Sequence, residues 1–185
     1  MTQMNLLLIS GSLRGGSYNR KLVIEAAGFF DGNPVMADLD LPLYNGDVED
    51  RTGVPAKVQL LRDQIAAADA VAISTPEYNQ SLSDVLKNAL DWVSRVDGNP
   101  WADKPVAIMS AAAGRSGGAR AQYALRLSLN PFQPRLLTGP EVMIARPDGE
   151  FDAKGQLTGE LYRDALSALM AKLKAETSCV ALMAA

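Results

Sequence analysis

Short apolar runs alternate along this chain with stretches in which apolar residues recur at helical spacing. The first run covers residues 5–10 and stops at a glycine-rich turn, as a strand buried on both faces does. Similar runs predict further strands at residues 34–39, 70–75, 106–110 and 142–145. The pattern therefore predicts five strands, each separated from the next by a longer segment.

Helical periodicity occupies most of those longer segments. Apolar residues from Leu22 to Phe30 fall on one stripe, as in a helix that lies against a sheet. Further stripes predict helices at residues 58–68, 82–93, 119–129 and 161–173, and either Ser81 or Ser83 is expected to cap the helix that starts near residue 82. Residues 40–53 are polar and contain proline, so they are predicted to form a loop.

This alternation of strands and helices predicts an α/β fold with a doubly wound parallel sheet. Each crossover is right-handed and covers one face, so helices are expected on both faces of the sheet. Five strands fit the flavodoxin-like order 2-1-3-4-5, in which a ligand binds beyond the carboxyl ends of strands one and three. The 185 residues contain no linker or internal repeat, so residues 1–185 are expected to form a single domain.

The turn after the first strand, residues 11–19, has the composition of a phosphate cradle. Glycines let backbone N–H groups converge on an anion at a helix N-terminus, Ser12, Ser17 and Asn19 add donors, and Arg14 adds positive charge. Ser17 stands where the lysine of a nucleoside-triphosphate loop belongs, so a monophosphate fits better. The alternative is an ordinary turn in which a serine caps the next helix.

Two more turns are predicted to meet the cradle at the same crevice. In residues 75–80, Tyr78 supplies a flat apolar face, and Asn79 and Gln80 can hydrogen-bond the edge of a planar ring, although a solvated loop after Pro76 explains them too. In residues 111–118, small residues permit close backbone approach, although flexibility or tight packing explains the glycines equally well. Together the three turns describe a site for a planar nucleotide such as FMN.

The composition excludes several kinds of chemistry. The chain has no histidine, so it contains no Ser-His-Asp or Cys-His pair and no imidazole metal ligand. Cys179 is its one cysteine, which excludes CxxC redox pairs and cysteine-bound zinc or iron–sulfur centres, and no metal site is predicted. A carboxylate or lysine enzyme remains possible, as does one whose reactive group is a bound organic cofactor.

Charge and the N-terminal sequence narrow the range of partners. Lys and Arg number 18 against 21 Asp and Glu, and the net charge of −3 argues against nucleic acid. The start of the chain lacks a basic segment, and the apolar run at residues 6–9 is far shorter than a signal core or a bilayer span. We therefore expect no membrane insertion and a cytoplasmic location, where a lone thiol stays reduced.

Three motifs carry a resemblance to a known family: GSLRGGSYN at residues 11–19, PEYN at 76–79 and LKNALDW at 86–92. From about residue 4 to 144 the chain resembles the NAD(P)H-dependent FMN reductases, including quinone- and chromate-reducing members. The resemblance implies that the first motif holds the FMN phosphate and the second borders the flavin ring. Close relatives often have hydroxyl residues where Ala111 and Ala112 stand, so only backbone contact is expected from residues 110–114. The expected cofactor-binding residues are Ser12, Leu13, Arg14, Ser17, Tyr18, Asn19, Pro76, Glu77, Tyr78, Asn79, Gln80, Ala112 and Gly114.

The resemblance also implies a reaction and an assembly. Hydride would pass from NADPH or NADH to bound FMN, and electrons would then pass to quinones or other planar or metal acceptors, without a catalytic side chain. The family forms homodimers or homotetramers through its third and fourth helices, although ordinary packing within the chain is the expectation for Trp92. The main alternative is a flavodoxin-type electron carrier, and another is a nucleotide-binding regulatory module; direct oxidation of NAD(P)H distinguishes the enzyme from both.

Overall fold

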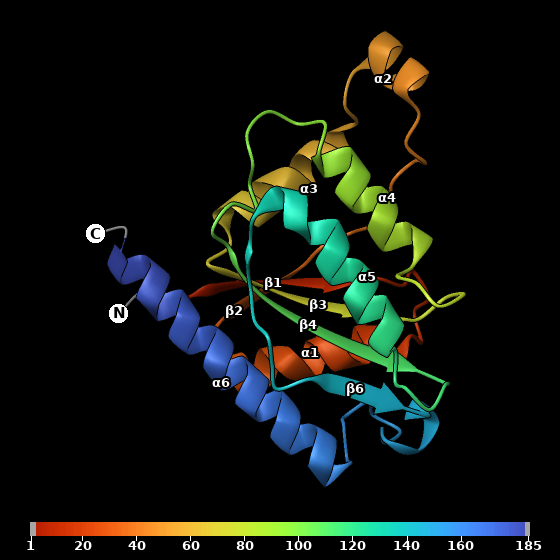
Figure 1. The fold of residues 1–185 in the computed structure, drawn as a ribbon, viewed down its shortest axis with the longest axis vertical. Coiled ribbons are helices and arrows are strands. Elements are labelled where there is room, and N and C mark those ends of the chain that lie inside the picture. The colour runs from red at the N-terminus through yellow and green to blue at the C-terminus, as the bar shows by residue number, and fades with distance from the viewer. Residues whose placement is uncertain (1–2, 184–185) are drawn as a thin grey trace.

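A parallel sheet forms the centre of the protein in the computed structural model, which describes residues 3–183. The strands follow the order β2-β1-β3-β4-β5, which confirms the predicted flavodoxin-like topology (Figure 1). Their bounds are β1 Asn5–Ser10, β2 Asn33–Met36, β3 Ala70–Thr75, β4 Pro105–Ala112, β5 Arg135–Leu136 and β6 Val142–Ala145. All pairings between neighbouring strands are parallel, so the carboxyl ends of the strands meet at one edge.

The fifth position of the sheet differs from the prediction because two short strands share it. β5 pairs with the start of β4, whereas β6 pairs with its end. The segment between them contains Pro140, which has no N–H to donate to a ladder, and this explains the interruption. The sequence pattern revealed β6 alone, since two residues are too few to show a period.

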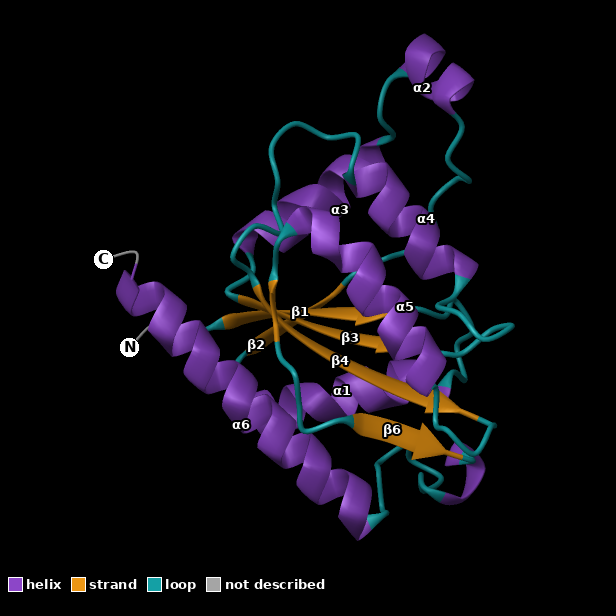
Figure 2. Cartoon of the chain, viewed as in Figure 1, coloured by secondary structure: helices purple, strands orange, loops and turns teal. Residues whose placement is uncertain are grey.

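Helices cover both faces of the sheet, as predicted (Figure 2). Their bounds are α1 Tyr18–Phe30, α2 Gly46–Thr52, α3 Ala56–Ala67, α4 Asp84–Val93, α5 Ala119–Leu129 and α6 Glu160–Met183. α3, α4 and α5 pack on one face, and α1 and α6 on the other. Ser83, rather than Ser81, caps α4 by accepting a hydrogen bond from the N–H of Leu86. Across residues 3–183, no helix combines the length and apolarity that a bilayer span requires.

The two apolar layers of the core follow the two-residue period of the strands. Leu7 and Ile9 of β1 face α3, α4 and α5, whereas Leu6 and Leu8 face α1 and α6. Trp92 is buried in the first layer, and its Nε1 donates to the carbonyl of Pro42 at 2.7 Å. Packing within the chain therefore accounts for Trp92, as expected.

The polar stretch at residues 40–53 contains a helix that the periodicity did not predict. α2 has no buried residue, so it shows no apolar stripe, and it projects from the rest of the molecule (Figure 1). Asn45 caps it by accepting from the N–H of Asp47. Arg95, just after α4, holds it with a 3.0 Å ion pair to Glu49.

Candidate functional site

A cavity of about 510 Å³ lies where the carboxyl ends of β1, β3 and β4 meet. Its volume falls within the range of about 300–1,000 Å³ that small-molecule sites occupy. It is lined by Ser12, Arg14, Gly16, Ser17, Tyr18, Asn19, Pro76, Glu77, Tyr78, Ala111, Ala112, Ala113, Pro147 and Asp148. The fold thus brings the three predicted turns to one crevice.

Most of the expected site residues line this cavity, but four lie outside its lining. Leu13 faces a neighbouring hollow beside β2, and Asn79 lines a groove on the far side of the second turn. Gln80 and Gly114 are exposed beyond the cavity wall. The sequence reasoning also missed the segment at Pro147 and Asp148, although its place directly after the predicted strand at 142–145 was a usable signal.

The first turn ends in a capped helix N-terminus. The Oγ of Ser17 accepts hydrogen bonds from the N–H groups of Asn19 at 3.2 Å and Arg20 at 3.4 Å, which leaves its hydroxyl hydrogen for a ligand. Among residues 3–183, the N–H groups of Leu13, Gly15 and Gly16 make no backbone hydrogen bond. α1 also has no acidic residue in its first turn, so this end of the helix suits an anion.

Asn19 is directed into the sheet as well as lining the cavity. Its side chain is buried, and its amide both donates to the carbonyl of Ala111 and accepts from the N–H of Ala111, each at 2.9 Å. Its Oδ1 also accepts from the hydroxyl of Ser74 at 2.9 Å. These bonds join α1 to the ends of β3 and β4.

The second turn is a short hairpin. Tyr78 and Ser81 exchange two backbone hydrogen bonds of 3.1 and 3.0 Å. Asn79 and Gln80 between them have φ angles of 48° and 65°, and a two-residue hairpin loop with positive φ at both positions is typical of a type I′ turn. The hairpin holds Tyr78 at the surface, where it borders both the cavity and the groove beyond it.

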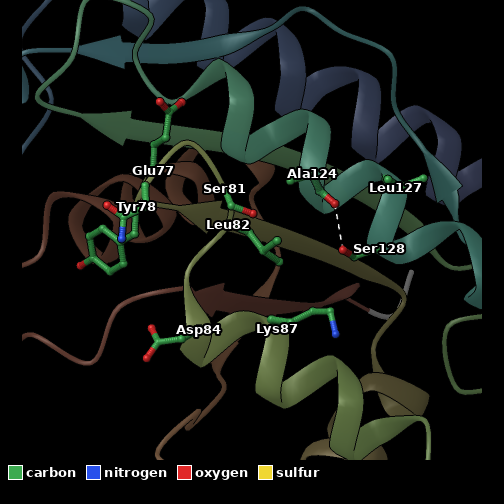
Figure 3. A pocket seen from close by; sticks show the side chains of 10 residues that line it. Glu77, Tyr78, Ser81, Leu82, Asp84, Lys87, Ala124, Leu127 and Ser128 are labelled. Carbon is green, nitrogen blue, oxygen red and sulfur yellow. Dashed lines mark hydrogen bonds between the residues drawn. The ribbon is translucent and has the colours of Figure 1, made fainter.

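Glu77 connects this hairpin to α5. Its carboxylate accepts from the backbone N–H of Arg120 at 3.1 Å and lies 3.4 Å from the guanidinium Nη1 of the same residue. The cap position of α5 is Gly118, which has no side chain, so Glu77 supplies the negative charge that this helix end favours. Figure 3 shows the Glu77 side chain turned away from Asp84 and Lys87.

Gly118 permits close packing between α5 and β4 beside the cavity. Its φ is 97°, and an added Cβ would lie 2.7 Å from the Oγ of Ser110. The Ser110 hydroxyl in turn donates to the carbonyl of Gly117 at 2.7 Å. This glycine pair is therefore a packing requirement and not a sign of flexibility.

A larger groove of about 1,030 Å³ lies beyond the hairpin, between α4 and α5 (Figure 3). It is lined by Glu77, Tyr78, Asn79, Ser81, Leu82, Asp84, Lys87, Ala124, Leu127 and Ser128. Because Glu77 and Tyr78 border both hollows, the hairpin forms the wall between the cavity and this groove.

Asp38 lies behind the cradle, in the hollow that Leu13 and Arg20 also line. Its carboxylate accepts from the N–H of Asp40 at 2.9 Å and from the Nζ of Lys57 at 3.0 Å. These bonds, the backbone one first, lower the pKa of Asp38.

Comparisons with known proteins agree on one family. The profile of the family described as NADPH-dependent FMN reductase matches residues 4–147. An NAD(P)H-dependent FMN reductase of Pseudomonas aeruginosa is 48% identical over 164 residues, which are 87% of this chain and 88% of that protein. A quinone reductase of Escherichia coli is 42% identical over 145 residues, which are 76% and 77% of the two chains. A solved flavoenzyme, an NAD(P)H:(acceptor) oxidoreductase of Paracoccus denitrificans, superposes with a TM-score of 0.84 at 31% identity, covering 95% of this chain and 97% of that one.

Proposed function

The chain belongs to the NADPH-dependent FMN reductase family, and from that membership we propose that it is an FMN-dependent NAD(P)H oxidoreductase that reduces quinones. Membership confirms the resemblance drawn from the three sequence motifs. It also favours an enzyme over a flavodoxin-type carrier, because the relatives are named as reductases that act on small molecules.

The observation that carries this proposal is the convergence of three different walls on one cavity. The capped N-terminus of α1 suits a phosphate, and the N–H group of Gly16, which lines the cavity and makes no backbone hydrogen bond within residues 3–183, is available to bind it. The hairpin offers the aromatic face of Tyr78, and residues 111–113 offer side chains no larger than a methyl group. A flat ring attached to a monophosphate fits this combination.

Each expected residue then receives a place relative to FMN. We assign the phosphate to the cradle, where Ser17 and Arg14 donate, and the ring to the space between the hairpin and the end of β4. Among the cavity-lining residues, Ser12, Arg14, Ser17, Tyr18 and Asn19 form the phosphate side, Pro76, Glu77 and Tyr78 the ring edge, and Ala112 the opposite wall. Leu13, Asn79, Gln80 and Gly114 lie outside the lining, so their part in binding FMN is proposed from the sequence motifs alone.

The residues of the chain bind and orient, and they supply no reactive group of their own. When bound, FMN supplies the redox chemistry, taking hydride from a nicotinamide and giving electrons to a quinone or another acceptor. The chain has no histidine, and Cys179 is exposed on α6, a helix that contributes nothing to the cavity lining. The backbone N–H groups and the hairpin therefore fix the geometry in which donor and acceptor meet the ring.

Reconstitution tests this function directly. The protein is freed of flavin, and consumption of NADPH and NADH with a benzoquinone is measured before and after addition of FMN. We expect no turnover in the apoprotein and turnover after FMN is added. Failure to bind FMN overturns the cofactor assignment, and FMN binding without oxidation of either nicotinamide favours the electron carrier.

We further propose that the protein works as a homodimer or homotetramer in the cytoplasm. The exposed side chains of Tyr123 and Leu127 lie one turn apart on α5, the second of the two helices that flank the groove, and this apolar pair supports an interface there. The free thiol of Cys179 and the use of NAD(P)H fit a reducing compartment. Sedimentation velocity of the holoprotein measures the assembly, and a monomer at micromolar concentration would contradict it.

A further inference from the structure

β4 extends two residues beyond the end of β3, and this leaves its edge on the β3 side without a strand partner there, while β6 pairs with the other edge. The register pairs Thr75, the last residue of β3, with Ser110 of β4. Pro76 follows Thr75, has no N–H and ends the strand. The next residue of β4, Ala111, is buried, so its N–H and carbonyl require partners from elsewhere.

The side chain of Asn19 takes the place of the missing strand. A carboxamide carries the same donor and acceptor as a peptide group, and here it satisfies both the N–H and the carbonyl of Ala111 at 2.9 Å. The Ser74 hydroxyl donates to the same Oδ1, also at 2.9 Å, and fixes the orientation of the amide. Asn19, Ser74 and Ala111 are all buried, with 3% or less of each residue exposed.

This arrangement couples the two halves of the cavity. Asn19 lies two residues after Ser17, the cap that forms the phosphate side. Ala111 begins the segment 111–113 that forms the ring wall, and Ser74 lies two residues before Pro76, where the hairpin begins. One amide thus connects the phosphate side with both walls of the ring side.

We propose that Asn19 is a positioning residue, whose amide completes the backbone of β4 at Ala111 and so sets the position of the ring wall relative to the phosphate cradle. The proposal rests on the FMN site proposed above. It assigns Asn19 an effect on the binding of the ring itself, through Ala111 and Ser74. A residue that only touched the phosphate would have no such effect, and this difference makes the two roles separable.

Two ligands that share the flavin ring, one with a phosphate and one without, distinguish a positioning residue from a phosphate ligand. Dissociation constants of FMN and of lumiflavin, which has the ring alone, are measured by fluorescence titration for the wild type and for Asn19→Ala, Ser74→Ala and Ser17→Ala. A lost hydrogen bond in a buried site corresponds to a change of about tenfold in affinity. We expect Asn19→Ala to raise the dissociation constant of lumiflavin by about tenfold, and Ser74→Ala to raise it by a smaller factor.

Ser17→Ala is the contrasting variant, because Ser17 belongs to the phosphate side. Ser17→Ala is expected to weaken the binding of FMN. The dissociation constant of lumiflavin is expected to stay within about twofold of the wild-type value, since no contact to the ring changes. If Asn19→Ala behaves like Ser17→Ala, weakening FMN alone, Asn19 is a phosphate ligand and the positioning role is wrong. If wild-type protein binds no FMN, the proposed function fails instead.

A second readout needs no flavin. Hydrogen exchange of the Ala111 N–H is measured in the apoprotein, where Asn19 is its acceptor. We expect Asn19→Ala to accelerate this exchange by about tenfold or more, and Ser74→Ala to accelerate it by a smaller factor. The exchange of the central N–H groups of β3 is expected to stay unchanged in both variants. Unchanged exchange at Ala111 would overturn the proposal. If Asn19→Ala does not fold, Ser74→Ala decides, because it removes the hydroxyl that orients the Asn19 amide and keeps the amide itself. Unchanged Ala111 exchange together with an unchanged lumiflavin affinity in Ser74→Ala would then overturn the proposal.

Discussion

Ser17 serves both the stability of α1 and the proposed binding of phosphate. Its Oγ accepts two backbone N–H groups at the start of the helix, and its hydroxyl hydrogen stays available for a ligand. Ser17→Ala is therefore expected to lower the free energy of unfolding of the apoprotein by about 0.5–2 kcal/mol, as the loss of a serine cap does elsewhere. Urea unfolding measures this loss, and titration with FMN measures the accompanying loss of affinity.

Ser167→Ala is the matched control for this prediction. Ser167 is exposed on α6, away from the cavity, so its replacement is expected to leave the FMN affinity unchanged. Because alanine favours a helix interior more than serine does, it is also expected not to lower the free energy of unfolding. Equal effects of the two substitutions would contradict the role assigned to Ser17.

Asp38 gives the protein a predictable dependence on acid. Hydrogen bonds from the Asp40 N–H and from Lys57 lower the pKa of Asp38 in the folded state. Its stabilising contribution is therefore complete above the unfolded-state pKa of about 3.9 and disappears as pH falls through the lower folded-state pKa. Between about pH 5 and about pH 2, the free energy of unfolding of Asp38→Asn is therefore expected to fall by less than that of the wild type. Urea unfolding of both proteins across that pH range measures the difference. If their free energies of unfolding fall in parallel with pH, Asp38 makes no such contribution.

Single residues also mark the limit of what the sequence predicts about the site. Asn19 and Glu77 were identified as site residues from their motifs, but their protein partners were not. Those partners, Ala111 and Arg120, lie 92 and 43 positions away along the chain. Whether a polar side chain binds the ligand or the protein depends on such distant contacts, which local patterns do not contain.

The hairpin and α5 act as a unit because Glu77 bonds both the backbone and the side chain of Arg120. Arg120→Ala removes the guanidinium alone, whereas Glu77→Ala also leaves the N–H of residue 120 without its carboxylate acceptor. We expect Glu77→Ala to destabilise the apoprotein by about 1–2 kcal/mol and Arg120→Ala by about half of that or less. Thermal unfolding of both variants and of the double variant measures the coupling. If Arg120→Ala destabilises the protein more than Glu77→Ala does, the hydrogen bond from the N–H of Arg120 to the Glu77 carboxylate contributes little to stability.

The type I′ turn of the hairpin allows a stabilising substitution. Gln80 has a φ of 65°, a conformation that glycine adopts at no steric cost. Gln80→Gly is expected to raise the apoprotein's free energy of unfolding by up to about 1 kcal/mol, and Gln80→Val, which places a β-branched side chain there, to lower it by about 1–2 kcal/mol. The order of the two variants in urea unfolding checks the turn type, and a stability of Gln80→Val equal to that of Gln80→Gly would exclude it.

Elements with a strong period were predicted closely, and weak ones were missed. The bounds of β3, α5 and β6 agree with the predicted ranges because their apolar residues are buried in regular order. α2 was missed because it buries nothing, and β5 because two residues show no alternation.

At the scale of the whole molecule, the parallel topology explains why three turns so far apart in the sequence form one site. The strands that precede the three turns all end at the same edge of the sheet, so the three turns lie next to one another and line one cavity. This arrangement was predictable from the alternation of strands and helices. The hairpin and the amide of Asn19, which give the cavity its shape, were visible in the folded structure alone.

The central claim is that this cavity holds an FMN that NAD(P)H reduces and a quinone reoxidises. Anaerobic stopped-flow absorbance of the FMN-loaded protein measures it most directly, with NADPH or NADH mixed first and a benzoquinone second. The account predicts that the oxidised-flavin absorbance is lost at a rate that saturates with nicotinamide concentration and returns when the quinone is added. Flavin that dithionite bleaches but neither nicotinamide reduces would contradict it.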